Sequence, residues 1–145
     1  MAKNLPTNDL NPAKQAVALR AAFPTATVTV RPSGLTWLGR LQPTALSLVY
    51  KVRIEYDMGK RPRVTVVDPP LQPPPGDRIR HVFDGERLCL HYPQQWSGDM
   101  WICRTVVAWT SEYLLYHELL RATGEWLGGG HEPPSRGSGS SSRSE

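Results

Sequence analysis

Apolar residues recur along this chain first with a helical period and then with a period of two. Residues 8–23 repeat them at helical spacing and therefore predict a first helix. Asn11 is a favourable N-cap, Pro12 suits a first helical turn, and Pro24 ends the element.

The four segments that follow alternate apolar and polar residues, which is typical of strands with one buried face. The predicted strands span residues 25–30, 35–41, 46–56 and 63–67. In the third, Leu46, Leu48 and Tyr50 are expected on the core side, and Lys51 and Arg53 on the water side. Consecutive strands with short connections favour an antiparallel meander with helices stacked on one face.

The C-terminal half predicts one long helix. Residues 68–77 contain five prolines and are expected to run extended along the surface instead of pairing in a sheet. The helix is predicted over residues 101–123, with Asp99 as its cap and Gly124 just beyond its last turn. Residues 125–127 are expected to fold back on it.

The predicted fold class is therefore α+β: an N-terminal helix, a four-stranded antiparallel meander, an active-site loop and a long C-terminal helix. One domain is expected over residues 8–127. Residues 128–145 are rich in Gly, Ser, Pro and Arg, cannot bury a core, and are predicted to be disordered.

Composition narrows the expected environment. No signal peptide is recognised, and no apolar run approaches the roughly 20 residues that a membrane-spanning helix needs. A cytoplasmic protein with two unpaired cysteines is expected. The net charge is +4, and the densest basic cluster comprises Lys51, Arg53, Lys60, Arg61 and Arg63. Such a cluster is either the solvated face of a hairpin or an attractive surface for nucleic acid or an acidic protein.

The candidate chemistry lies in residues 81–103, which hold both cysteines. If residues 88–90 are extended, Cys89 and His91 project to the same face, about 6.5–7 Å apart at the backbone. Cys89 is then a candidate nucleophile and His91 a candidate general base, because the thiolate is the reactive form of a cysteine. Arg87 falls on the same face and would favour the thiolate by its charge.

Less specific interpretations remain open for each of these residues. A cysteine between two leucines is often a buried small apolar residue, and this applies to Cys89. Cys103 is interpreted as a core residue. His81 is a candidate structural hydrogen-bonding group, and His117 is interpreted as a packing residue on a helix face.

Other chemistries find little support. Cys89, His91, Cys103 and His81 would supply four zinc ligands, but their spacing contains no Cys-x-x-Cys knuckle and matches no common zinc module. The sequence also contains no phosphate-binding Gly-rich loop before a helix, no dinucleotide fingerprint and no Gly-x-Ser-x-Gly elbow. No metal or cofactor is therefore expected.

The order of elements and the thiol segment together resemble the ubiquitin-conjugating enzyme (UBC-fold) family. In that family a His-Pro-Asn signature precedes the catalytic cysteine, a Leu follows it, and a tryptophan stands before the next helix. His81 occupies the place of that histidine and Cys89 that of the cysteine, while Trp96 or Trp101 corresponds to the tryptophan. Residues 68–71, Asp-Pro-Pro-Leu, resemble the proline-containing segment after the strands.

Two departures from the family pattern affect the expected site. Val82 and Phe83 follow His81 where the family has Pro-Asn, so the asparagine that stabilises the oxyanion is missing. His91 is the first candidate to replace it, and Asp84 is a candidate for positioning the amine. The two C-terminal helices of the family are not expected here either, since the composition after Trp126 predicts disorder.

Within this family, the sequence most resembles the ubiquitin-conjugating-like proteins of bacterial CBASS anti-phage operons. The residues that carry this resemblance are Cys-Leu-His-Tyr-Pro at 89–93 and Thr-Gly-Glu-Trp at 123–126. The resemblance implies that Cys89 carries the C-terminus of a neighbouring cyclic-nucleotide synthase as a thioester. The acyl group would pass to a lysine or another nucleophile on an acceptor that the sequence does not identify. A non-catalytic binding module of the same fold is the alternative, and a basic nucleic-acid-binding domain is a third.

Overall fold

The computed structural model describes residues 9–83, 87–90 and 95–128. The elements along the chain are α1 (Pro12–Ala22), β1 (Thr27–Arg31), β2 (Gly34–Leu41), β3 (Tyr50–Asp57), β4 (Arg63–Asp68) and α2 (Val106–Thr123). The strands form one antiparallel sheet in the order β1-β2-β3-β4. The predicted α+β fold with a four-stranded meander between two helices is thereby confirmed.

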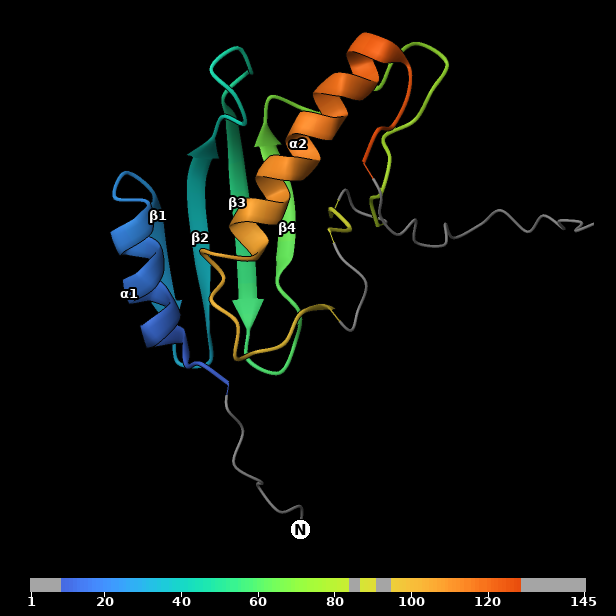
Figure 1. Cartoon of the computed structure of the whole chain (residues 1–145). Helices are drawn as coiled ribbons and strands as arrows, with labels where there is room; N and C mark the ends of the chain where they lie inside the picture. Colours follow the sequence, from blue (N-terminus) through green and yellow to red (C-terminus); the bar gives the residue numbers. More distant parts are fainter. Residues whose placement is uncertain (1–8, 84–86, 91–94, 129–145) are drawn as a thin grey trace, which may run out of the picture.

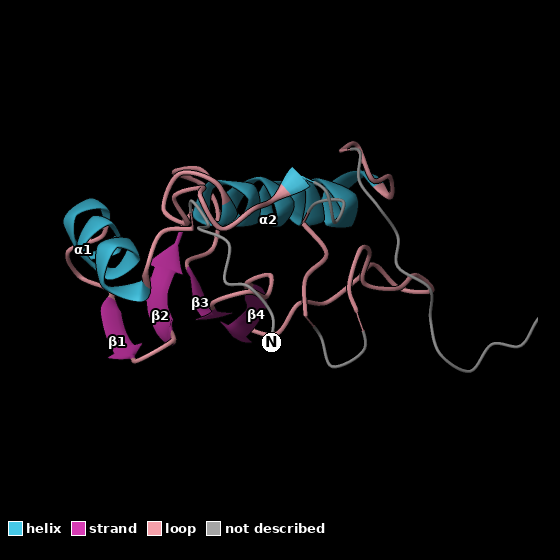
Figure 2. Ribbon diagram, turned by 90° about the horizontal axis from the view of Figure 1, so that it is seen from below, coloured by secondary structure: helices cyan, strands magenta, loops and turns pink. Residues whose placement is uncertain are grey.

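Both helices lie on the same side of the sheet, so the domain has two layers (Figure 2). Figure 1 shows α1 beside β1 and β2, and α2 crossing β3 and β4. A row of buried apolar side chains crosses the sheet in register, from Val28 to Trp37, Ile54 and Val64. The core lies between this row and the helices. No helix in the described part of the chain is long and apolar enough to cross a membrane.

The first helix begins at Pro12, four residues later than predicted, because Asn11 caps it. The side-chain Oδ1 of Asn11 accepts a hydrogen bond from the backbone N–H of Lys14 at 2.8 Å. Gln15, fully buried one turn later, joins α1 to the segment before α2. Its Nε2 donates to the carbonyl of Met100 at 2.8 Å, and its Oε1 accepts from the N–H of Ile102 at 3.0 Å.

The prediction that the third strand starts at Leu46 is wrong. Leu46 and Leu48 are 98% and 53% exposed, and β3 begins at Tyr50. The residues before it form a loop that is tied to α2 through the carboxylate of Glu118. This carboxylate accepts hydrogen bonds from Ser47 Oγ at 2.6 Å, the N–H of Leu48 at 3.2 Å and the Tyr50 hydroxyl at 2.8 Å. Alternation in the sequence therefore continues past the point where the chain leaves the sheet.

The long helix also starts later than predicted, at Val106 instead of residue 101. Asp99 does not cap it, since its carboxylate accepts a hydrogen bond from Ser97 Oγ, and Thr105 precedes the helix without a side-chain capping bond. The C-terminal prediction is confirmed: Gly124 adopts a left-handed φ of 82°, and its N–H donates to the carbonyl of Leu120 at 2.7 Å.

His117 is a buried packing residue of α2, as predicted. Its side chain is 2% exposed, and Nδ1 has no hydrogen-bond partner in the described part of the chain. Burial and the charge of Arg121 lower the pKa of His117, and the charge of Glu118 opposes this shift. The histidine is therefore neutral in the folded protein at neutral pH.

We expect this buried histidine to make the domain less stable in mild acid. Below its ordinary pKa of about 6.5 the unfolded chain protonates His117 while the folded protein does not, so the free energy of unfolding falls as the pH falls from about 7.5 to 5.5. Urea unfolding of the wild type and of His117→Gln measures the effect. The variant should show the smaller decrease, and parallel pH profiles for the two proteins would contradict it.

Candidate active site

A short hairpin holds Cys89. The N–H of Cys89 donates to the carbonyl of His81 at 2.7 Å, and the N–H of Phe83 donates to the carbonyl of Arg87 at 2.7 Å. Val82 pairs with Leu88 between these two bonds in antiparallel register. The sequence predicted a loop here, whereas residues 81–83 pair with residues 87–89.

The hairpin also extends the sheet beyond β4. The N–H of Leu88 donates to the carbonyl of Val64 at 2.9 Å, and Arg87 pairs with Thr65. Residues 87–88 therefore lie between β4 and the first arm of the hairpin. The row of buried apolar side chains that crosses the sheet thus continues from Val64 to Leu88. Leu88 belongs to the contiguous cluster of buried apolar residues that forms the core, called the core cluster below.

Cys89 faces away from that core. Side chains alternate along an extended segment, so Cys89 shares the face of exposed Arg87 and not that of Leu88. Cys89 is nevertheless only 4% exposed, and in the described part of the chain it lies outside the contiguous core cluster. Cys103, by contrast, is half-buried and packs against the core, and no disulfide joins the two cysteines.

His81 lies next to Cys89 in an unusual backbone conformation. Its φ of 54° is in the left-handed region, which costs a residue with a Cβ roughly 1–2 kcal/mol and is more frequent for His, Asn and Asp than for most residues. Its carbonyl accepts the bond from Cys89, and its ring lies 4.8 Å from the Trp126 ring, centroid to centroid. Strained residues of this kind cluster at functional sites.

Aromatic side chains from the C-terminal segment complete the surroundings of His81. Beyond Gly124 the chain folds back on α2, as predicted, and brings Trp126 within 5.4 Å of Tyr113 and 5.8 Å of Tyr116 between ring centroids. The Tyr113 hydroxyl donates to the carbonyl of Arg80 at 2.5 Å, just before His81. Sequence reasoning gave these three aromatic residues no role at the site. The feature of the sequence that could have pointed to them is Gly124, where the chain was expected to reverse.

Two of the predicted site residues, His91 and Asp84, lie outside the described residues. The structure therefore places Cys89 and His81 together and leaves the roles of the other two as predictions. Arg87 lies with its guanidinium carbon 5.3 Å from the centre of the Phe83 ring. In the described part of the chain no three His, Cys, Asp or Glu side chains are grouped to hold a metal ion.

Trp96 and Trp101, the two candidates for the tryptophan of the family pattern, have different surroundings. Trp96 is buried and makes an edge-on contact with Tyr56 at a centroid distance of 5.6 Å. Trp101 is half-buried on the surface beside α1, where it lines a hollow with Val17. Of the two, only Trp96 belongs to the core cluster.

The predicted basic cluster is divided in the structure. Lys51 and Arg53 extend from β3 on the sheet face away from the helices. Arg63 forms ion pairs with Glu55 at 3.4 Å and Asp57 at 3.1 Å. Hydrogen bonds from Arg63 and Arg31 hold the pKa of Asp57 below its usual value. Lys60 and Arg61 lie in the turn before β4, close to the hairpin.

Comparison with known proteins gives a family for this arrangement. A family model described as "Type II CBASS E2 protein" matches residues 15–133, which include most of α1, the whole sheet, the hairpin with Cys89, and α2. No curated protein matches the chain.

Proposed function

Because the chain belongs to the family of type II CBASS E2 proteins, E2-like components of anti-phage defence, we propose that it carries the C-terminus of a partner protein as a thioester on Cys89. The proposed donor is the cyclic-nucleotide synthase of the same operon. The acyl group then passes to a lysine amine or another nucleophile of an acceptor.

The observation that carries this proposal is the position of Cys89. It stands on a hairpin at the edge of the sheet, faces away from the core, and is bonded through its backbone to the strained His81. Cys89 is as buried as its neighbour Leu88, but of the two only Leu88 belongs to the contiguous core cluster. This difference between the two neighbours supports the proposed chemical role of Cys89.

The proposed reaction has two acyl-transfer steps. In loading, the Cys89 thiolate attacks the activated carbonyl carbon of the donor's C-terminus, a C–S bond forms, and the activating group leaves with its electron pair. In transfer, the acceptor nitrogen attacks the same carbon, a C–N bond forms, and the Cys89 thiolate leaves. The proton lost by the amine goes to a base, for which His91 is proposed, with Asp84 positioning the amine.

The burial of Cys89 imposes a condition on this chemistry. At 4% exposure the sulfur is not open to a macromolecular donor. Docking of the donor must therefore displace the groups that cover it before the sulfur attacks. The same burial favours the second candidate function, a binding module of this fold that performs no acyl transfer.

Intact-mass analysis separates the two functions. The protein is mixed with the synthase and the activating components, and a covalent adduct is expected whose mass equals the sum of the two chains less one water. The adduct should disappear on treatment with a thiol such as dithiothreitol, as a thioester does. Peptide mapping should locate it on Cys89. A non-covalent complex without any adduct, or an adduct on Cys103, would contradict the proposed function.

A further inference from the structure

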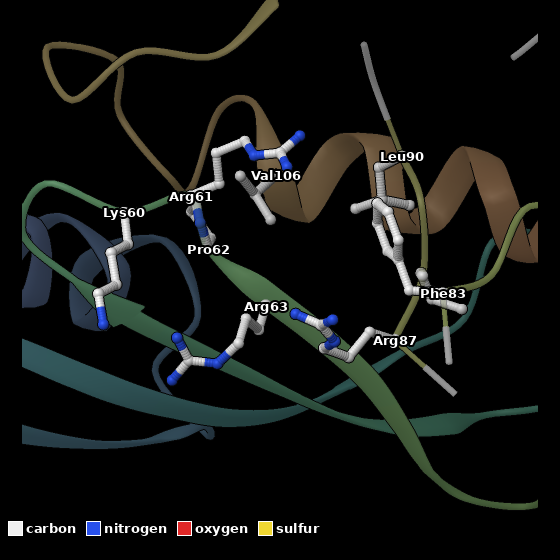
Figure 3. A pocket seen from close by; sticks show the side chains of 9 residues that line it. Lys60, Arg61, Pro62, Arg63, Phe83, Arg87, Leu90 and Val106 are labelled. Carbon is white, nitrogen blue, oxygen red and sulfur yellow. The ribbon is translucent and has the colours of Figure 1, made fainter. Parts of the chain in front are cut away.

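A pocket with basic walls opens beside the thiol hairpin. Its volume is about 230 Å³, and it lies between the turn before β4, the hairpin and the start of α2. Figure 3 shows the long side chains of Lys60, Arg61, Arg63 and Arg87 around it, with Val106 beside Arg61 and Leu90 near Phe83. The walls are therefore cationic, and the lining also includes apolar side chains.

Most of this positive charge is not neutralised within the described part of the chain. Arg63 is paired with Glu55 and Asp57, but no ion pair joins Lys60, Arg61 or Arg87 to a carboxylate of the described residues. All three side chains belong to exposed residues. Three such cations around one cavity attract an anionic group and offer it charge-assisted hydrogen bonds.

The pocket is adjacent to the proposed acyl carrier. Arg87 precedes Cys89 by two residues on the same face of the hairpin arm, which places their backbones about 6.5–7 Å apart. Leu88 and Leu90, on either side of Cys89, also line the pocket. Cys89 itself does not line the pocket, but this proximity allows a chain whose C-terminus reaches Cys89 to place its preceding residues there.

A neighbouring apolar hollow favours a polypeptide occupant over a nucleic acid. Its volume is about 390 Å³, and it is lined by Val66, Leu71, Ile79, Val82 and Phe83 among others. Phe83 lines both cavities, so the two are neighbours. A peptide supplies acidic and apolar side chains together, whereas the phosphates of a nucleic acid would be matched by the basic pocket alone.

We propose that this pocket selects acyl donors whose C-terminal segment carries acidic side chains just before the residue that is joined to Cys89. The inference rests on the proposed function and names the class of substrate. Carboxylates of the donor pair with Lys60, Arg61 and Arg87, and this pairing holds the donor's C-terminal carbonyl near the sulfur.

Binding is tested without chemistry, in full-length Cys89→Ala. Two fluorescein-labelled peptides are compared by anisotropy at low salt, one with several glutamates and its counterpart with glutamines. The acidic peptide should bind roughly tenfold more tightly, since two or three exposed charge pairs contribute a few tenths to about 1 kcal/mol each. When Arg61→Gln and Arg87→Gln are added to this variant, the difference in affinity between the two peptides should disappear. The control carries Lys14→Gln and Arg40→Gln instead, at exposed residues away from the pocket, and should keep the difference in affinity.

Three binding results would overturn the inference. They are equal binding of the two peptides, a difference that survives the loss of Arg61 and Arg87, and a single-stranded DNA of equal charge that binds this pocket more tightly than the acidic peptide.

A loading experiment distinguishes failure of the proposed donor selectivity from failure of the proposed function. The wild type is given the same two peptides as C-terminal thioesters, and faster loading of the acidic one is expected. Equal loading of both would overturn the selectivity and leave the acyl carrier intact. Loading of neither peptide, together with no adduct from the activated synthase in the intact-mass experiment, would overturn the acyl carrier itself.

Discussion

Cys89→Ala is expected to form no thiol-reducible adduct with an activated donor, whereas Cys103→Ala should form as much adduct as the wild type. The first variant removes the only sulfur on the hairpin arm. The second removes a sulfur that packs against the core at the start of the α2 region. Non-reducing gels with and without dithiothreitol measure the difference, which for the first variant is complete loss.

Cys89→Ser refines this test because an oxygen at the same position changes the bond and keeps the geometry. A serine that accepts the acyl group forms an ester, which resists dithiothreitol and is cleaved by hydroxide. We expect slow formation of such a dithiothreitol-resistant adduct in this variant, since a hydroxyl is a weaker nucleophile than a thiolate. An adduct that stays thiol-reducible in Cys89→Ser would place the acyl group on another cysteine.

Folding must be separated from chemistry in these variants, because Cys89 is buried. Alanine and serine are both smaller than cysteine or equal to it in size, and Cys89 lies outside the core cluster, so its replacement should leave the sheet intact. Thermal unfolding of the two variants and the wild type provides the control. Adduct loss with an unchanged unfolding transition assigns the loss to the missing sulfur.

The sheet and the helices were predictable from the sequence because their patterns are long. In β3, Val52, Ile54 and Tyr56 alternate with polar residues, and each of the three is buried as expected. The same alternation misplaced the start of the strand. Leu46 and Leu48 continue the period, but the Glu118 carboxylate, 70 residues away, holds their loop out of the sheet. No local pattern reports a contact at that separation.

The site was less predictable because its parts are short or distant. The arms of the hairpin have too few residues to show a period, and their pairing with β4 depends on the sheet being present. The packing of Trp126 against His81 joins residues 45 positions apart through the reversal at Gly124. The identity of Cys89 as the candidate came from its neighbours in sequence and from the family resemblance. Its orientation away from the core required the structure.

The left-handed backbone of His81 supplies a physical reason for the hairpin's geometry. A left-handed residue turns the chain sharply, and here it brings the His81 carbonyl to the N–H of Cys89. The Trp126 ring lies 4.8 Å from the imidazole of His81, centroid to centroid, and is tilted against it.

His91→Ala is expected to slow acyl transfer by a factor of about 10² to 10⁴, the usual contribution of a general base. His91 follows Cys89 by two residues, the spacing that places two side chains on one face of an extended segment. It is also the first candidate for the donor that stabilises the oxyanion in place of the missing asparagine. Single-turnover measurements with preloaded protein give the transfer rate, and the loading rate is measured separately.

The pH dependence distinguishes a base from a residue that only supports the fold. If His91 accepts the proton of the amine, the transfer rate of the wild type should fall in mild acid, in the range where an imidazole titrates, and this inflection should be absent in His91→Ala. His117→Gln is the matched control, because that histidine is buried in α2 and should affect stability without affecting the transfer rate of the folded protein. An unchanged transfer rate in His91→Ala would assign His91 a structural role, and the proton would then have to leave by way of solvent or the acceptor itself.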